Sequence, residues 1–417
     1  MNRWMGRAAA ALLLAVSAGA ALEPVAAQRQ AKGAASAPKF KFSKEVQPLL
    51  AKAQQAQQAN DHATAIGLLA EADAIPTKNA DDSYMIGMLR INSGLGTQDN
   101  ALIEAGIEQA LASGRVAPED QGKFIRNLGS LALQRGDTAK AAQQYDRYLA
   151  MNPDDADVMA ETAELHRRAN DNAKAVATLQ QAIATKERVT GAKADESWYR
   201  RTLAIAYDAN LPVQTAAASE ALVKAYPSPT NWRDVLVIFR ETSRLDDQTN
   251  LDALRLARAA KALAGERDYF EYAETAHMRG LPGEAKIIID EGVAAGALQL
   301  SKPVVKELNA AATSRAAEDK AGLAAAEKEA RTAKNGRAAL GTGDALLGLS
   351  QYDRAVEMYR LALEKGGVDA DVVNTRIGIA LARKGDTAGA EAAFAAVKGS
   401  PRVQLARYWQ IWSSQRG

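Results

Sequence analysis

The sequence lacks cysteine altogether and contains few prolines and aromatic residues. Without cysteine the chain can form no disulfide bond and can carry no lipid anchor attached through a cysteine, so packing must supply its stability. Proline accounts for 12 of the 417 residues and aromatic residues for 5%, whereas alanine is abundant. Because alanine has the highest helix propensity and proline interrupts helices, this composition predicts an all-α fold.

Residues that commonly carry chemistry are equally scarce. The three histidines, His62, His166 and His277, lie far apart, and no two have the i, i+4 spacing of a helical metal site. Adjacent acids such as Asp154 and Asp155 stand at expected helix starts, where capping explains them. No serine lies in a G-x-S-x-G motif. We therefore expect no metal, no cofactor and no enzymatic activity.

The chain also lacks a strong excess of either charge. Removal of residues 1–27 would take away two arginines and one glutamate, which leaves 50 basic and 49 acidic residues and a net charge of +1. Such a balanced chain has no overall field that would attract nucleic acid or an acidic membrane surface. We expect no nucleic-acid partner.

The N-terminus has the pattern of a secretory signal peptide. Arg3 and Arg7 precede an apolar run over residues 8–21, and Val25, Ala26 and Ala27 offer small residues for cleavage. A run of 14 residues is shorter than the roughly 20 that span a bilayer. We expect cleavage after residue 27, a mature chain without a transmembrane helix, and a periplasmic or secreted bacterial protein. An uncleaved anchor is the alternative.

A helical hairpin spans residues 122–153. Its first half places apolar residues on one stripe, and its second half repeats the pattern; these residues are Ile125, Leu128, Ala132, Ala141, Tyr145 and Leu149. Gly136 between the halves can adopt the left-handed conformation that ends a helix, and Asp137 can cap the next one. One such hairpin cannot bury both stripes, so it requires neighbours.

Those neighbours are present in the sequence. The second-half residues reappear 34 positions later as Ala175, Leu179 and Ile183, and residues 135–139 match residues 384–388. A helix–turn–helix unit of 34 residues that also contains Leu128, Gly129, Gly136, Tyr145 and Pro153 at these spacings resembles the tetratricopeptide repeat (TPR) family. The resemblance implies an α-solenoid of stacked repeats, in which the first helix of each repeat, helix A, forms the inner face.

The repeat pattern divides the chain into five segments. Residues 1–27 are the signal peptide, 28–42 a flexible linker and 43–300 a TPR-like repeat array; 301–334 form an irregular helical spacer, and 335–417 contain further repeats and a C-terminal capping helix. No turn motif divides the spacer, which is either one long helix or two helices kinked near Gly322. The capping helix carries Leu405, Tyr408, Trp409 and Trp412, which suit the open end of a stack.

The resemblance also implies a binding surface. TPR ligands commonly lie along the helix A face, and the outward positions of three successive repeats here are Lys123, Arg126, Gln134, Glu164, Arg167, Arg168, Arg200 and Tyr207. Arginines can hold carboxylates through two parallel hydrogen bonds, so acidic segments are candidate ligands. The alternative is a solvated face whose charges pair locally.

The interpretation that these observations favour is an exported scaffold or adaptor of the cell envelope that binds proteins or peptides on the helix A face. An accessory subunit that positions an envelope hydrolase or synthase, acting on cell wall or polysaccharide, is the alternative. A third possibility is an enzyme, which a buried cluster of titratable groups in a cleft would support. No sequence feature predicts the oligomeric state.

Overall fold

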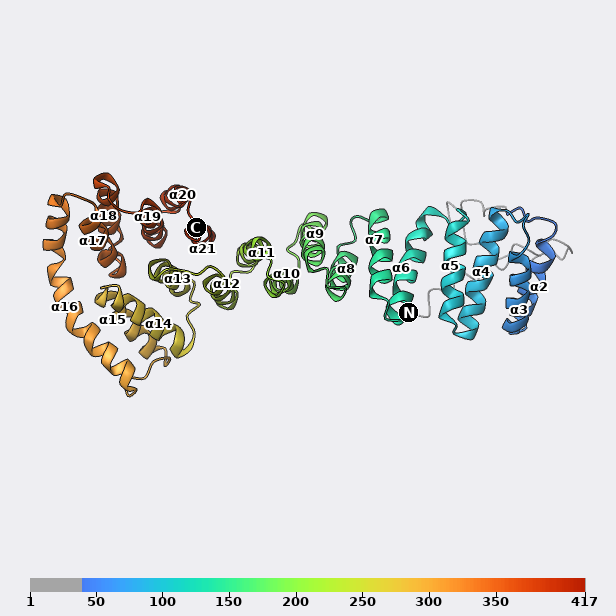
Figure 1. Ribbon diagram of the computed structural model, residues 1–417, viewed down its shortest axis with the longest axis horizontal. Coiled ribbons are helices and arrows are strands. Elements are labelled where there is room, and N and C mark those ends of the chain that lie inside the picture. The colour runs from blue at the N-terminus through green and yellow to red at the C-terminus, as the bar shows by residue number, and fades with distance from the viewer. Residues whose placement is uncertain (1–39, 417) are drawn as a thin grey trace, which may run out of the picture. The chain divides into compact units, whose positions relative to one another are not determined.

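The computed structural model describes residues 40–416, so the expected signal peptide and nearly all of the expected linker lie outside the described residues. The described part is all-α and consists of helices that pair through short turns, as an α-solenoid of TPR-like repeats requires. It forms two compact units, residues 40–189 and residues 190–416, whose helices are labelled in Figure 1. Between residues 40 and 416, no helix combines the length and the apolar character needed to cross a membrane.

The first unit contains four helical hairpins. Their helices are α2 (Gln47–Gln58), α3 (His62–Asp73), α4 (Ala80–Thr97), α5 (Asn100–Ala112), α6 (Pro118–Gln134), α7 (Thr138–Met151), α8 (Ala156–Arg168) and α9 (Asn172–Thr190). The apolar stripes expected on α6 and α7 face the interior, since Ile125, Leu128, Ala132, Ala141 and Tyr145 are all buried. Neighbouring hairpins thus bury the stripes that a single hairpin would leave exposed.

The turns between paired helices have the expected chemistry. Gly136 and Gly385 are left-handed, with φ of 78° and 96°. Asp137, which follows Gly136, accepts a hydrogen bond of 2.9 Å from the backbone N–H of Lys140 and so caps α7. Asn170 stands 34 residues after Gly136 and is also left-handed, with φ of 61°. The same turn therefore recurs in successive repeats, with glycine or asparagine at its left-handed position.

The first described residues already belong to the fold. Phe40 stacks on Tyr84 of α4, with ring centroids 5.3 Å apart. The backbone N–H of Lys41 donates to Asp81, and that of Ser43 to Asp82. Residues 40–42 are thus held against α4, whereas the sequence placed them in the flexible linker. Phe40 and Phe42, two aromatic residues in a short polar segment, are the sequence feature from which this packing could have been predicted.

The second unit begins with three hairpins: α10 (Glu196–Asp208), α11 (Pro212–Ala225), α12 (Pro229–Thr242), α13 (Asp247–Ala259), α14 (Gly265–Met278) and α15 (Pro282–Ala294). After the long helix α16 (Pro303–Thr332) come α17 (Arg337–Gly348), α18 (Tyr352–Lys365), α19 (Ala370–Lys384), α20 (Thr387–Ala395) and α21 (Arg402–Ser414). The spacer is therefore one helix of 30 residues, about 45 Å long, which packs on α15 at one end and α17 at the other.

The last helix does more than cover the final repeat. α21 packs on α19 and α20, as expected of a capping helix, and it also packs on α11 and α13. Tyr408, Trp409 and Trp412 are buried there. The Tyr408 ring meets the rings of Trp232 and Phe239 of α12 edge-on, with centroids 6.4 and 5.5 Å apart. The chain of the second unit thus returns to its own first repeats.

Candidate functional site

The proposed binding face of the first unit lies on α6 and α8. Lys123 pairs with Asp120 at 2.6 Å, and Arg126 approaches Glu161 of α8 at 3.6 Å. Glu164 accepts from both Arg167, at 2.7 Å, and Arg168, at 3.1 Å. Gln134 accepts a hydrogen bond from Asn100 at 3.0 Å. Local pairing therefore involves every one of the six expected groove residues in this unit.

These pairs are exposed, which distinguishes them from a buried core network. The side chains of Arg126, Arg167 and Arg168 are 45%, 46% and 57% exposed. The hydrogen bond to Glu164 raises the pKa of the Arg167 guanidinium, which stays charged. Exposed ion pairs contribute only about 0–1 kcal/mol because water competes for both partners. An incoming carboxylate could therefore exchange at small cost with Glu161, which is 55% exposed, more readily than with Glu164, which is 17% exposed.

The other two groove residues belong to the second unit, on α10. Arg200 donates to Asn231 at 2.7 Å and pairs with Asp234 at 2.9 Å, while Tyr207 donates to Glu241 at 3.0 Å. The hydrogen bond to Glu241 raises the pKa of the Tyr207 hydroxyl. These partners lie on α12, 31 to 34 residues away, so polar contacts join helix A of one repeat to helix A of the next.

The structure thus brings together Glu164, Arg167 and Arg168 on α8, with Arg126 beside them through Glu161. Arg200 and Tyr207 share α10 in the other unit. That all eight residues form one continuous surface stays a prediction.

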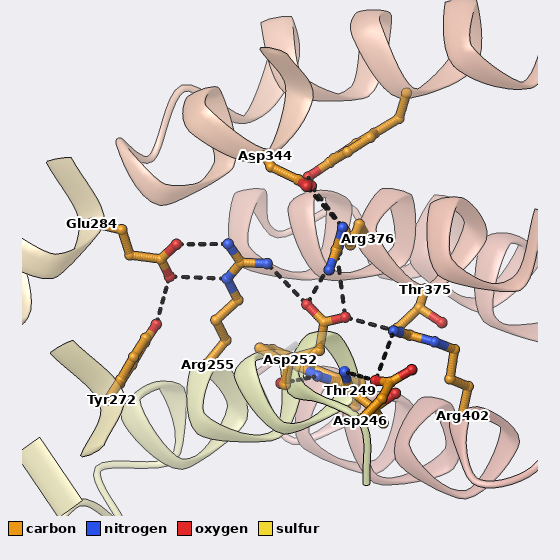
Figure 2. A network of polar contacts seen from close by, with 12 residues as sticks. Asp246, Thr249, Asp252, Arg255, Tyr272, Glu284, Asp344, Thr375, Arg376 and Arg402 are labelled. Carbon is orange, nitrogen blue, oxygen red and sulfur yellow. Dashed lines mark hydrogen bonds and ion pairs between the residues drawn. The ribbon is translucent and has the colours of Figure 1, made fainter. Parts of the chain in front are cut away.

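A second cluster, which the sequence did not reveal, lies buried in the second unit (Figure 2). Its centre is Asp252 of α13, whose side chain is completely buried. Three arginines from three helices surround its carboxylate: Arg255 of α13 at 2.9 Å, Arg376 of α19 at 3.3 Å and Arg402 of α21 at 2.9 Å. We call this cluster, with the side chains that extend it, the Asp252 network.

Two further carboxylates extend the Asp252 network. Arg255 donates to both oxygens of Glu284 of α15, at 2.9 and 2.6 Å, and the Tyr272 hydroxyl donates to Glu284 at 2.7 Å. On the other side, Arg376 donates to both oxygens of Asp344 of α17, at 3.0 and 2.8 Å. The Tyr359 hydroxyl also donates to Asp344, at 2.8 Å. Three carboxylates thus balance three guanidinium groups.

Burial and charge act against each other on these groups. Burial alone would raise the pKa of the Asp252 carboxyl, but Arg376, Arg255 and Arg402 outweigh it and lower that pKa to about 2. Burial likewise opposes ionisation of Glu284, yet Arg255 holds its pKa below the usual value. For Asp344 burial prevails, so its pKa is raised although Arg376 faces it. Burial also raises the pKa of Tyr272 and Tyr359 well above the usual value.

The Asp252 network is enclosed rather than open to a ligand. The side chains of Asp252, Arg255, Glu284 and Arg376 are at most 4% exposed. Because each carboxylate already faces a guanidinium group, the arrangement suits structural cohesion, not acid–base catalysis on a substrate. In residues 40–416, no group of three or more His, Cys, Asp or Glu side chains could hold a metal ion.

The sequence did not predict this network because the ion pairs that join its helices link residues 29 to 150 positions apart. A local signal does exist, since Asp252 and Arg255 lie at i, i+3 among the apolar residues Leu251, Leu254 and Leu256. Charged residues on the buried stripe of a helix require partners. Nothing in the sequence, however, identifies Arg376 and Arg402 as those partners.

Comparison with known proteins agrees with the repeat pattern. Residues 126–188 match the family model described as tetratricopeptide repeat. No curated protein sequence matches the chain significantly. The similar solved structures include a tetratricopeptide repeat protein from Parabacteroides merdae, at 14% identity and a TM-score of 0.27, which covers 72% of this chain and 99% of that one. Pseudomonas aeruginosa pilF matches at 15% identity and a TM-score of 0.22, over 44% of this chain and 93% of that one. The TPR domain of P58(IPK) matches at 14% identity and a TM-score of 0.24, over 82% of this chain and 99% of that one.

Proposed function

We propose that this tetratricopeptide-repeat protein is an exported scaffold of the bacterial cell envelope that binds acidic segments of other proteins on helix A. TPR proteins generally serve as protein-binding scaffolds. The observation that carries the finer proposal is the row of half-exposed arginines on α6 and α8: Arg126, Arg167 and Arg168. This row lies within the segment that matches the TPR family.

The charge of this face favours an acidic ligand modestly. Lys123, Arg126, Arg167 and Arg168 provide four positive charges, against three negative charges from Asp120, Glu161 and Glu164. A ligand carboxylate can bind an arginine through two parallel hydrogen bonds and so replace the single contact that Arg126 or Arg168 makes, whereas Arg167 already forms two hydrogen bonds with Glu164. Because these pairs are exposed to solvent, binding should weaken as salt concentration rises.

The binding proposal predicts a loss of partner capture without loss of fold. Combined replacement of Arg126, Arg167 and Arg168 by alanine should weaken capture at least about tenfold, since three charge-assisted contacts contribute more than about 1.4 kcal/mol together. Exposed charges contribute little to stability, so thermal unfolding should change by only a few degrees. A partner identified by proximity labelling can be titrated against the parent protein and against the triple variant, and the two affinities compared.

A matched control exists on the other helix of the same repeat. Lys174, Lys186 and Arg188 of α9 are also paired and exposed, and their combined replacement by alanine removes the same three charges. Capture should survive in this control variant. Equal loss in both variants would mean that net charge, rather than the helix A face, determines binding.

Export is a separate part of the proposal, and its support comes from the pattern of residues 1–27. If it holds, the mature protein begins at Gln28 and is released by osmotic shock. N-terminal sequencing of protein purified from the native host measures this directly. Recovery of membrane-bound protein that still starts at Met1 would contradict it, whatever the outcome of the binding test.

A further inference from the structure

Residues 402–415 close the second unit by contacts with helices far earlier in the chain. Gln404 donates to Glu220 of α11 at 2.8 Å, and Gln415 donates to the carbonyl oxygen of Val223 at 2.8 Å. The Trp409 indole N–H donates to the carbonyl oxygen of Asp252 at 3.3 Å. These contacts span 157 to 192 residues of sequence. We call residues 402–415 the C-terminal strap.

The strap is anchored by charge at its start and by aromatic rings along its length. Arg402 pairs with Asp252, while Tyr408 and Trp409 are buried against α12 and α13. The hydrogen bonds of Arg402 are less complete than those of the other arginines in the Asp252 network. The second terminal nitrogen of Arg402 is buried, has no hydrogen-bond partner among residues 40–416 and lies 3.9 Å from the Asp246 carboxylate.

A charged centre makes this contact specific but adds little net stability. Burying an ion pair removes both charges from water, and this desolvation offsets much of their attraction. When the strap separates, water can hydrate Arg402 again, while Arg376 of α19 still pairs with Asp252. Separation of an apolar contact offers no such compensation. The charged anchor therefore determines where the strap docks, whereas the burial of Leu405, Tyr408 and Trp409 supplies most of the attraction.

Of the helices that the strap contacts, α13 belongs to an apolar core that the strap does not share. One cluster of buried side chains joins α13, α14, α15 and the first half of α16, and includes Leu254, Tyr272, Ile288, Val305 and Ala312. No buried member of this cluster comes from α19 or α21. The cluster can therefore persist when the strap leaves α11 and α13.

We propose that the C-terminal strap is a reversible closure: it holds the second unit closed through the Asp252 network and can open while α13, α14 and α15 stay folded. Opening would expose the surface of α11 and α12 that Tyr408 covers, including the rings of Trp232 and Phe239. This inference holds with or without the proposed ligand of α6 and α8.

Distance measurements in the full-length protein can test the closure. Val213 of α11 is 76% exposed, and Ser414 at the end of α21 is also exposed, so cysteines introduced at these two positions can carry spin labels. The native sequence has no cysteine that would compete for the label. Arg402→Gln removes the charged anchor, and Asp252→Asn removes its partner. Arg407→Gln on the same helix is the control, because Arg407 is 57% exposed and lies 3.7 Å from Glu220.

The closure predicts a second, longer distance population in Arg402→Gln and Asp252→Asn, and an unchanged distribution in Arg407→Gln. Hydrogen exchange should speed up in α21 and on the covered face of α11, while α14 and α15 keep their protection. Unchanged distances in both network variants would overturn the proposal. So would a loss of protection in α14 and α15 together with α21 in Arg402→Gln, because the strap would then be part of one indivisible core.

Discussion

Charged residues of this protein act in two different ways. On α6 and α8 they pair at the surface, where each pair contributes little to stability and leaves the groups available to a ligand. Around Asp252 they are enclosed, and removal of one partner leaves an unpaired charge away from water, which costs about 3–5 kcal/mol. The same residue types thus form exposed pairs in one unit, where we propose that they bind a ligand, and an enclosed network in the other.

This difference predicts a pH dependence of the second unit. The pKa of Asp252 is about 2 in the folded protein, below its usual value of 3.8. Its contribution, about 2 kcal/mol, is therefore fully present above pH 4 and lost as the pH falls toward 2. Glu284 acts in the same direction, whereas the raised pKa of Asp344 has the opposite sign and favours folding at low pH.

Chemical denaturation between pH 2 and 6 measures this dependence. Asp252→Asn should lower the free energy of unfolding at pH 6 and flatten its fall below pH 4. Asp290 is a suitable control because its carboxylate is 61% exposed and pairs with Lys286 of the same helix. Asp290→Asn should leave both the value and the slope nearly unchanged. An equally steep acid limb in Asp252→Asn would contradict the account of the Asp252 network.

At the scale of single elements, the turns determine where each hairpin closes. Gly136 has φ of 78°, and a Cβ added there would meet no atom within 4 Å. The cost of a substitution is therefore that of the backbone conformation alone. Gly136→Val should destabilise the first unit by more than about 1 kcal/mol, because β-branched residues resist the left-handed region. Urea unfolding monitored by circular dichroism measures the change.

The next repeat supplies the control for this prediction. Asn170 adopts the same conformation 34 residues later, with φ of 61°. Gly136→Asn should therefore cost only a few tenths of a kcal/mol, because asparagine tolerates this region. A large loss in both variants would indicate that the turn is constrained by something other than its dihedral angles.

Much of each helix and turn was predictable because the residues that determine it are close together in the sequence. The stripe of Ile125 and Leu128, the turn at Gly136 and the cap at Asp137 follow from residues a few positions apart. α16 left two alternatives open, since Gly322 could kink a helix or sit within one. The structure has one helix because Val305, Ala312, Leu323 and Ala330 continue a single buried stripe through Gly322.

At the scale of the whole molecule, the stacking of repeats was predictable from the sequence. The contacts of α21 with α11 and α13, which close the second unit, were not. Stacked repeats mainly contact their sequence neighbours, so a 34-residue period is enough to predict them. Arg402 and Asp252 lie 150 residues apart, and no periodicity relates them. The candidate binding face was predictable only as a set of positions, because the pairing of Arg167 with Glu164 depends on side-chain conformation.

Site-specific photo-crosslinking tests the central claim of a helix A binding face most directly. A photoreactive amino acid at Lys123 or Gln134 of α6 would report on the helix A face, and one at Lys174 of α9 on the opposite helix of the neighbouring hairpin. The account predicts crosslinks to one partner protein, in the native host, from Lys123 and Gln134 but not from Lys174. Crosslinks to that partner from Lys174 alone, or equally from all three positions, would contradict it.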